Sequence, residues 1–369
     1  MKNFEKIFIL FADKYKFKIG KTLGKGGFGE VKEMINQRNK VYAAKIVKQK
    51  KKIKQAGSDS EGDQKEKDNI ILNLKNPNIV QIHKIYDEEY AEDDNKKETY
   101  NLIVMEKAVL KDLKTFIKSL YNQNIDNFIN QPFNDVVGNH LLQFFCLQIV
   151  NGLEYLERNE LIHFDIKPEN ILIFLNLALK LSDFGLLKEV SQMEKIRIPG
   201  GTPGYLSPEY YQFQRNKVSI DIAKKQDYYA LGVTIYFIKY GKQMIKLKIE
   251  KSDKEDENRA NQEYIVDTLQ KKIIFIKSDK LADKDFIKFL CSLIQIDPDD
   301  RPFFEEIYRN KWLNKNVNSI KKVLNAFKYD EPKLIDEFRK KDYLIEKKKE
   351  LTKKREIKKF IFIPKKKGK

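Results

Sequence analysis

Two aspartates and an asparagine stand at a spacing that suits chemistry on magnesium-bound phosphate groups. Asp165 and Asn170 lie in the run LIHFDIKPEN, and Asp183 opens the triplet DFG thirteen residues after Asn170. Carboxylate and amide oxygens are hard ligands of the kind that Mg²⁺ accepts while it keeps waters and takes phosphate oxygens for its other positions. The spacing therefore indicates phosphoryl chemistry that is assisted by a divalent metal.

Four further motifs occur in a fixed order along the chain. The glycine-rich run GKGGFG spans residues 24–29, AAK ends at Lys45, SPE ends at Glu209, and DYYALG begins at Asp227. One glycine triplet alone is a weak signal, but five motifs in one order over about 300 residues are not explained by chance. In these motifs the chain resembles the eukaryotic protein kinases of the serine/threonine type.

The resemblance implies an α+β fold with two lobes, a small antiparallel-sheet lobe with one main helix and a larger, mainly helical lobe. We expect the kinase domain over residues 15–313, with the small lobe at 15–106 and the large lobe at 109–313. Residues 1–14 are an N-terminal extension in this interpretation. Residues 314–369 are expected to form a basic, lysine-rich tail that is helical or disordered.

Hydrophobic periodicity agrees with this division. Alternation typical of strands fills residues 15–47, and helical periodicity takes over beyond Lys107, where we place the hinge. Helices are expected at 110–120, 139–157 and 228–240. Four segments are too polar to bury and are expected as loops or insertions: residues 48–69, which lead into a helix, the acidic stretch 88–98, and residues 121–136 and 246–261.

The resemblance implies that ATP and Mg²⁺ are the cofactors. Asp165 is expected to accept or orient the proton of the substrate hydroxyl, and Lys167 to neutralise the γ-phosphate. Asn170 and Asp183 are the expected metal ligands, so the catalytic residues are Asp165, Lys167 and Asn170 in this interpretation. Lys45, on the third strand, would hold the α- and β-phosphates as a point charge.

The glycine-rich run and the hinge are expected to hold the nucleotide. Glycines let backbone N–H groups approach phosphate oxygens that a side chain would keep at a distance. Met105 would border the adenine pocket. The expected nucleotide contacts are Leu23, Gly24, Lys25, Gly26, Gly27, Phe28, Gly29, Glu30, Val31, Lys45 and the backbone of Glu106 and Ala108.

The sequence departs from the family pattern on the helix that follows Lys45. A glutamate normally holds this lysine, but here the corresponding position carries Lys67, which would repel Lys45. A shift by one residue would bring in Glu66 or Asp68, or the lysine is held in some other way. Of these alternatives we favour Glu66.

A second departure precedes Asp165, where Phe164 replaces the usual arginine. That arginine normally pairs with a phosphate on the activation segment, so one electrostatic link between phosphorylation and activity is missing. We therefore hypothesise that Asp165 is competent without phosphorylation of the segment. Thr202 is expected to be a hydrogen-bond partner of Asp165 and Lys167 and not a phosphorylation site.

Two expected scaffold contacts complete the resemblance. Glu209 should form a buried ion pair with Arg301. Asp227 should hold the backbone of the catalytic loop from the start of the apolar helix. Neither residue is expected to take part in the chemistry.

Composition bounds the interpretation. Of the 369 residues, 41% are hydrophobic, which suffices for a sizeable core. The net charge is +18, and residues 314–369 hold 20 Lys and Arg against 8 Asp and Glu. No apolar run reaches the roughly 18 residues of a membrane span, and no cleavage site follows the N-terminus, so neither a span nor a signal peptide is expected. Cys146 and Cys291 are expected to be buried thiols in an intracellular protein, cytoplasmic or also nuclear.

The expected partners are protein substrates, and we expect a monomer. The basic tail allows a weak anionic partner, RNA or an acidic membrane surface. Two rival functions remain open: a catalytically inactive binding module, which the anomaly at Lys67 favours, and an anionic-surface binder that carries a kinase domain.

Overall fold

The structure is a computed structural model of the chain, and the residues that it describes fall in several ranges. The chain divides into two units, Met1–Val317 and Asn318–Lys369, and the second unit lies outside the described residues, as does nearly all of the predicted tail. The described ranges are 4–26, 29–49, 61–93, 96–122, 136–213, 216–246, 255–280 and 282–315.

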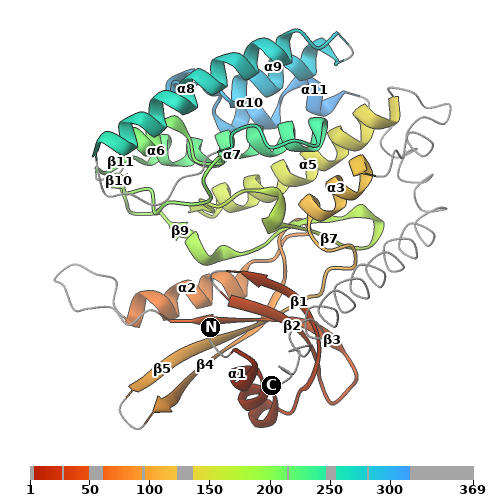
Figure 1. Cartoon of the computed structure of the whole chain (residues 1–369), viewed down its shortest axis with the longest axis vertical. Coiled ribbons are helices and arrows are strands. Elements are labelled where there is room, and N and C mark those ends of the chain that lie inside the picture. The colour runs from red at the N-terminus through yellow and green to blue at the C-terminus, as the bar shows by residue number, and fades with distance from the viewer. Residues whose placement is uncertain are drawn as a thin grey trace, which may run out of the picture. The chain divides into compact units, whose positions relative to one another are not determined.

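The small lobe is built on a five-stranded antiparallel sheet in the order β1-β2-β3-β5-β4 (Figure 1). Side chains alternate between its two faces, so Ala44 and Ile46 point to one face while Ala43 and Lys45 point to the other. The strands are β1 (Lys18–Gly26), β2 (Gly29–Ile35), β3 (Val41–Lys48), β4 (Ile82–Asp93) and β5 (Lys96–Met105), and helix α2 (Glu61–Asn73) comes between β3 and β4.

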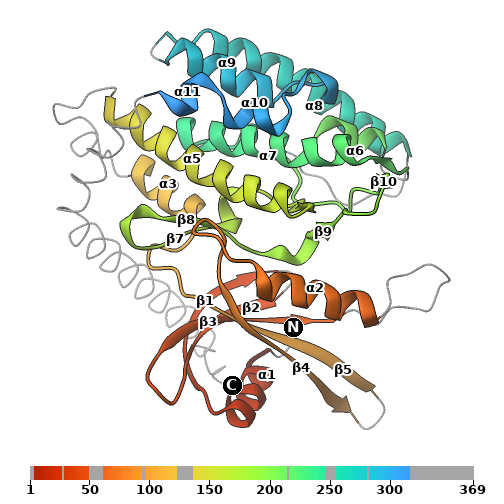
Figure 2. The same ribbon diagram turned by 180° about the vertical axis from the view of Figure 1, so that it is seen from behind.

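Helix α1 (Phe4–Tyr15) packs into the core of this lobe, which the sequence interpretation did not anticipate for residues 1–14. Phe8 and Phe11 are fully buried against sheet residues that include Ala44, Ile46 and Leu102. The apolar side chains recur at helical spacing, so the pattern was legible, but the run is short. Figures 1 and 2 show α1 and α2 on opposite sides of the sheet.

The predicted acidic loop at 88–98 was wrong, because β4 and β5 remain paired through it from Ile82 and Met105 to Asp93 and Lys96. Residues 94–95 lie outside the described residues. The acidic groups are tolerated in the sheet because they have partners: Glu88 accepts from the Tyr15 hydroxyl, and Glu98 pairs with Lys48. Polarity alone therefore misled the sequence interpretation here.

The large lobe is mainly helical, and its short strand pairs carry the loops of the site (Figure 2). Its α-helices are α3 (Leu113–Asn122), α5 (Val136–Arg158), α6 (Pro208–Gln212), α7 (Ile220–Tyr240), α8 (Glu255–Lys277), α9 (Lys284–Leu293), α10 (Phe304–Tyr308) and α11 (Lys311–Asn314). The strands are β6 (Leu161–Ile162), β7 (Ile171–Ile173), β8 (Leu179–Leu181), β9 (Lys188–Glu189), β10 (Lys195–Ile196) and β11 (Val218–Ser219). Short 3-10 helices are η1 (Pro168–Asn170), η2 (Leu175–Leu177), η3 (Phe184–Leu186) and η4 (Pro298–Asp300).

The α+β class with two lobes is confirmed. The predicted helices at 110–120 and 139–157 correspond to α3 and α5, whereas α7 begins at Ile220, eight residues before the predicted start. Of the predicted polar insertions, residues 50–60, 123–135 and 247–254 lie outside the described residues. Both cysteines are buried free thiols. None of the helices in the described ranges is long and apolar enough to cross a membrane.

The packing of α1 predicts a large stability effect. Phe11→Ala is expected to lower the free energy of unfolding by about 3–5 kcal/mol, because it leaves a cavity in the small-lobe core. Ile9 lies on the same helix with 45% of its surface exposed, so Ile9→Ala is the matched control, with an expected change within about 0.5 kcal/mol. Denaturant unfolding measures both, and equal effects of the two changes would contradict this packing.

Candidate active site

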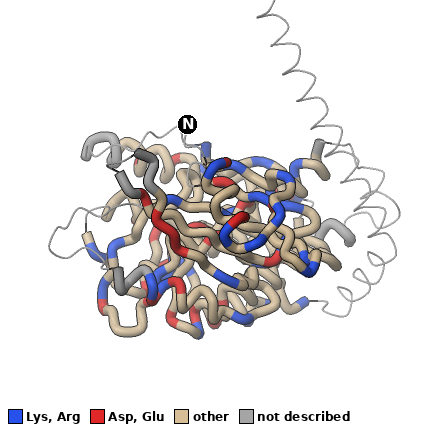
Figure 3. The backbone as a smooth tube through the Cα atoms, turned by 90° about the horizontal axis from the view of Figure 1, so that it is seen from below, with Lys and Arg blue, Asp and Glu red and all other residues tan. Residues whose placement is uncertain are grey.

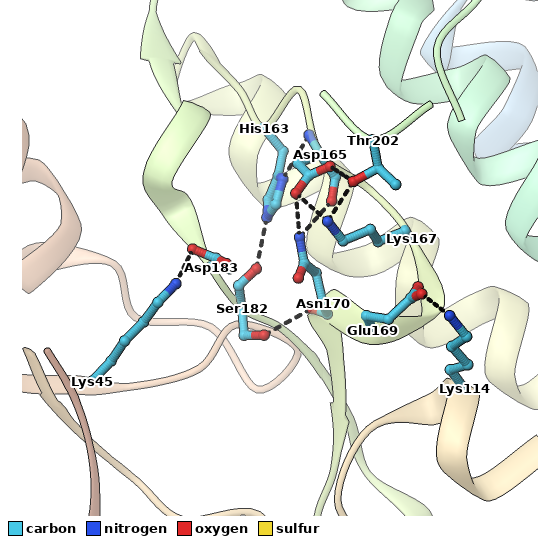
Figure 4. A network of polar contacts seen from close by, with 10 residues as sticks. All are labelled: Lys45, Lys114, His163, Asp165, Lys167, Glu169, Asn170, Ser182, Asp183 and Thr202. Atoms are coloured by element: carbon cyan, nitrogen blue, oxygen red, sulfur yellow. Dashed lines mark hydrogen bonds and ion pairs between the residues drawn. The ribbon is translucent and has the colours of Figure 1, made fainter. Parts of the chain in front are cut away.

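Three side chains orient the carboxylate of Asp165. Lys167 Nζ lies 2.6 Å from Asp165 Oδ2, Asn170 Nδ2 donates to the same oxygen at 2.8 Å, and Thr202 Oγ1 donates to Oδ1 at 2.8 Å (Figure 4). Thr202 also accepts from Lys167 Nζ, so its predicted role as partner of both residues is confirmed. Because the amide nitrogen of Asn170 faces Asp165, its oxygen remains available for a cation.

Asp227 holds the backbone of the loop that carries Asp165, as predicted. Its two carboxylate oxygens accept from the N–H groups of His163, at 2.8 Å, and Phe164, at 2.9 Å. Burial raises the pKa of Asp227 to about 7, although these two hydrogen bonds act in the opposite direction. Asp227 lies inside α7 and not at its start, so a long buried helix fixes the position of the carboxylate.

Phe164 anchors the activation segment through apolar contacts. The ring is 1% exposed and belongs to a buried cluster. This cluster also contains residues of the activation segment and of α7. Its φ of +64° is unusual for a residue with a bulky side chain, and the Asp227 hydrogen bond and the buried ring hold it there. The other buried members of the cluster are Ile162, Val190, Ile196, Ile198, Val218 and Ala223.

The hydroxyl groups of the activation segment differ in accessibility. Residues 183–209 are all described and contain Ser191, Thr202 and Ser207. Ser191 is exposed, Thr202 is bound to Asp165, and Ser207 is fully buried with its hydroxyl 2.7 Å from Gln226 Oε1. Ser191 is therefore the accessible hydroxyl among the serines and threonines of this stretch.

Lys45 and Asp183 connect the two lobes. Lys45 Nζ lies 2.7 Å from Asp183 Oδ1, and β3 places the lysine between Val31 of β2 and Ile103 of β5. Burial would raise the pKa of Asp183, but the Lys45 ammonium, by its charge and its hydrogen bond, holds that pKa below the usual value. Asp183 is therefore ionised and suited to bind a cation.

Lys67 occupies the position that the family pattern assigns to a glutamate, and it contacts the Asp183–Gly185 turn. Its Nζ donates to the backbone carbonyl of Gly185 at 2.6 Å. Glu66, the favoured alternative partner of Lys45, is exposed, and the ammonium of Lys45 binds Asp183 instead. The structure therefore does not support Glu66 as the partner.

The glycine-rich run forms the turn between β1 and β2, in which Gly26 pairs with Gly29. Added Cβ atoms at Gly24 and Gly26 would meet nothing within 4 Å, whereas one at Gly29 would lie 2.1 Å from the Ile46 carbonyl oxygen. Position 29 must therefore be glycine, because a side chain there would collide with β3. Gly24 and Gly26 border open space. Gly27 and Phe28 lie outside the described residues.

The other predicted nucleotide contacts on these strands are partly committed to the sheet. The carboxylate of Glu30 is buried, accepts from the Thr22 hydroxyl at 3.2 Å and lies 3.1 Å from Lys25 Nζ. Leu23 and Val31 are partly buried on either side of the turn. Their contacts with a nucleotide stay a prediction.

The segment after β5 connects the lobes near Met105. The N–H of Glu106 donates to the Gln81 carbonyl at 3.1 Å, so the carbonyl is the backbone group of Glu106 that remains for an adenine base. Its carboxylate binds Lys180 Nζ at 2.7 Å. Lys107 pairs with Glu33 of β2 at 2.6 Å, and the predicted base contact at Ala108 stays a prediction.

The predicted ion pair between Glu209 and Arg301 is present and fully buried. Two parallel contacts of 2.6 and 2.7 Å join the guanidinium and the carboxylate, and the side chains are 0% and 1% exposed. Arg301 Nε also donates to the Gln295 carbonyl at 2.9 Å. This bidentate geometry fixes the end of the activation segment to the large lobe.

The donor set fits Mg²⁺ bound together with phosphate. Asp183 offers a charged oxygen and Asn170 a neutral one, and both are hard ligands. Among the described residues, no group of three or more His, Cys, Asp and Glu side chains could hold a metal without help.

Sequence reasoning missed two polar contacts near the site. Lys114 of α3 pairs with Glu169 of the catalytic loop, and Lys67 of α2 reaches Gly185. Each lysine stands in a lysine-rich chain in which no spacing singles it out. These contacts become visible only when the helices are placed in space (Figure 4 for Lys114).

The chain matches the family described as "Protein kinase domain" over residues 17–313. It is 28% identical over 306 residues to a "Serine/threonine-protein kinase stk11 homolog" of Dictyostelium discoideum, covering 82% of this chain and 46% of that protein. It is 28% identical over 300 residues to an "Aurora kinase" of Eremothecium gossypii, covering 81% and 70%. A "Serine/threonine-protein kinase ATG1" of Pichia angusta is 24% identical over 363 residues, covering 87% and 40%.

These matches and the geometry agree, and the chain belongs to the protein kinase family. Two of the three relatives are named as serine/threonine protein kinases. The chain spans about half or less of the length of these two relatives.

The apolar anchor at Phe164 predicts activity without phosphorylation of the segment. Phosphatase treatment and Ser191→Ala are each expected to change the rate of phosphoryl transfer by less than about twofold. The reason is that Phe164 has no positive charge with which to bind a phosphate group on the activation segment. A rate assay after treatment, with mass spectrometry to confirm phosphate removal, measures this. Loss of activity in both cases would refute the hypothesis.

Proposed function

We propose that this chain is an ATP-dependent serine/threonine protein kinase that transfers the γ-phosphoryl group of ATP to hydroxyl groups of protein substrates. The observation that carries the proposal is the carboxylate of Asp165, which Lys167, Asn170 and Thr202 orient together. Lys45 and Asp183 meet across the two lobes close to this carboxylate (Figure 4). Family membership and the names of the relatives support the same activity.

In the proposed reaction each side chain has a separate task. Asp165 orients the substrate hydroxyl and takes its proton as the oxygen attacks the γ-phosphorus and the bond to the β-phosphate oxygen breaks. Lys167 offsets the charge on the transferred group, and Lys45 holds the α- and β-phosphates. Asp183 and Asn170 would hold Mg²⁺, which neutralises charge on the phosphates when it is bound.

The preference for Ser and Thr follows from the loop that surrounds Asp165. Lys167 and Thr202 both contact Asp165, and both correspond to residues that serine/threonine kinases carry at these positions. The remaining proposals are a catalytic domain over residues 15–313, a monomer, and an intracellular location in the cytoplasm or also the nucleus. A weak anionic partner of residues 314–369 is proposed from charge alone, and that segment lies outside the described residues.

Replacement of Asp165 distinguishes an active kinase from a catalytically inactive binding module. Asp165→Ala is expected to lower transfer of radiolabelled phosphate from ATP by about 10²–10⁴-fold, the range for loss of a positioned proton acceptor. Asp221→Ala, an exposed aspartate at the start of α7, is the control and should retain activity. Equal incorporation by wild type and Asp165→Ala would remove the enzyme interpretation.

The surface next to Asp165 indicates what substrates the enzyme favours. Glu169, four residues after Asp165, pairs with Lys114 through Oε1, while its Oε2 is buried without a hydrogen-bond partner among the described residues. Burial, followed by the charges of Glu169 and Asp165, raises the pKa of Tyr205 in the activation segment. Because Lys114 neutralises Glu169, a basic residue in the substrate finds little attraction there.

The charge distribution over the rest of the described chain is mixed. Figure 3 shows that both basic and acidic residues occur along the described backbone, and that one stretch of it is mainly acidic. We therefore propose that basic residues next to the accepting hydroxyl are not required.

Removal of Lys114 should change this preference. Lys114→Ala is expected to raise the rate with peptides that carry Arg near the accepting Ser by about three- to tenfold over neutral peptides, because the Glu169 carboxylate loses its ammonium partner. Lys118→Ala, on the exposed side of the same helix, is the matched control. A peptide-array profile measures the preference, and an unchanged profile would contradict the proposed role of Lys114.

A further inference from the structure

Helix α2 reaches the Asp183–Gly185 turn through one lysine. Lys67 Nζ donates to the Gly185 carbonyl at 2.6 Å, and the next helical turn places Ile71 on the same side, where it is buried. Figures 1 and 2 both show α2 beside the segment that leads to β9. The side of α2 that carries Lys67 is therefore its inner side, and the lysine is placed there by the register of the helix.

The contact differs in kind from the ion pair that the family pattern predicts. The acceptor is a neutral carbonyl oxygen in the backbone, and the donor is an ammonium group, so the charge of Lys67 assists the hydrogen bond. Lys45, which would otherwise need a carboxylate on α2, is bound to Asp183 at 2.7 Å. Two lysines from different elements thus hold the same turn, one at Asp183 and one at Gly185.

The turn has a backbone that benefits from such support. Asp183 has a φ of +62°, in the left-handed region that non-glycine residues rarely adopt. The short helix that follows is closed by the Leu187 N–H, which donates to the Phe184 carbonyl at 3.2 Å. The hydrogen bond from Lys67 to the Gly185 carbonyl limits the backbone conformations that the turn can adopt. It thereby helps to fix the direction of the Asp183 carboxylate.

We propose that Lys67 is a positioning residue that sets the Asp183–Gly185 turn for binding of a nucleotide with its divalent cation, in place of a glutamate that would bind Lys45. The inference rests on the proposed function. If the missing glutamate limited nucleotide binding, Lys67→Glu would improve it. If Lys67 positions the turn, the same change removes the donor to Gly185 and does not improve binding. A carboxylate there would also compete with Asp183 for Lys45.

The experiment compares Lys67→Met, Lys67→Arg and Lys67→Glu in the full chain, with Lys65→Met and Lys65→Glu as controls. Lys65 is exposed on the same helix, so its variants reproduce the change in charge without the contact. Calorimetric titration with ADP and Mg²⁺ measures nucleotide binding. Hydrogen exchange of the amides of residues 184–187 measures the turn in the absence of nucleotide, and circular dichroism checks folding.

We expect Lys67→Met to weaken binding of ADP with Mg²⁺ and to speed amide exchange in the turn, each by about three- to tenfold, the effect of losing one such hydrogen bond. Lys67→Glu should bind ADP with Mg²⁺ no better than Lys67→Met. Lys67→Arg keeps a donor and should recover most of both properties. The Lys65 variants should match the wild type.

Two results would overturn the proposal. One is tighter binding by Lys67→Glu than by wild type, which would show that the missing glutamate limits the site. The other is unchanged exchange of residues 184–187 in Lys67→Met, which would show that the contact does not hold the turn. If the wild type does not bind ADP with Mg²⁺, the proposed function fails, while the exchange measurement still decides the role of Lys67.

Discussion

The geometry of the site depends on the buried carboxylate of Asp227. It accepts two backbone N–H groups, from His163 and Phe164, and so fixes the loop immediately before Asp165. A single carboxylate that satisfies two adjacent donors leaves the chain few alternatives, because an unpaired buried N–H group is costly. One of these hydrogen bonds, together with the buried ring, holds the positive φ of Phe164. The Asp165 carboxylate that follows is oriented by Lys167, Asn170 and Thr202. Asp227 therefore holds the loop before Asp165 in place and is not expected to take part in phosphoryl transfer.

A buried apolar cluster surrounds the position where the family pattern places an arginine. The family pattern places an arginine before the catalytic aspartate, where a phosphate can bind it, but here the Phe164 ring packs against Ile196 and Ile198 of the activation segment. Burial of such side chains does not depend on a modification or on ionic strength. The buried pair of Glu209 and Arg301 fixes the end of the same segment. The segment is thus held by contacts that form during folding.

The sequence predicted the parts of this protein that motifs of fixed spacing define. The fold class, the contact of Thr202 with Asp165, the loop contact of Asp227 and the ion pair of Glu209 could be predicted because the motifs resemble those of a known family. The wrong predictions arose where the polarity or length of a segment was used without knowledge of which segments it contacts in the folded chain. The acidic stretch at 88–98 is polar but paired across β4 and β5, and α1 is too short a run to stand out. The acceptor for Lys67 is a backbone carbonyl 118 residues away, which no pattern of side chains can indicate.

The position of α1 has a practical consequence for how this catalytic domain can be cut from the chain. The family match begins at residue 17, after the helix has ended. A fragment that starts there would leave Ala44, Ile46 and Leu102 facing water on the outer side of the sheet, a surface that invites aggregation. A fragment that keeps the core of the small lobe covered should therefore begin at or before Phe4. Any partner that binds this side of the sheet must contact the helix and not the strands.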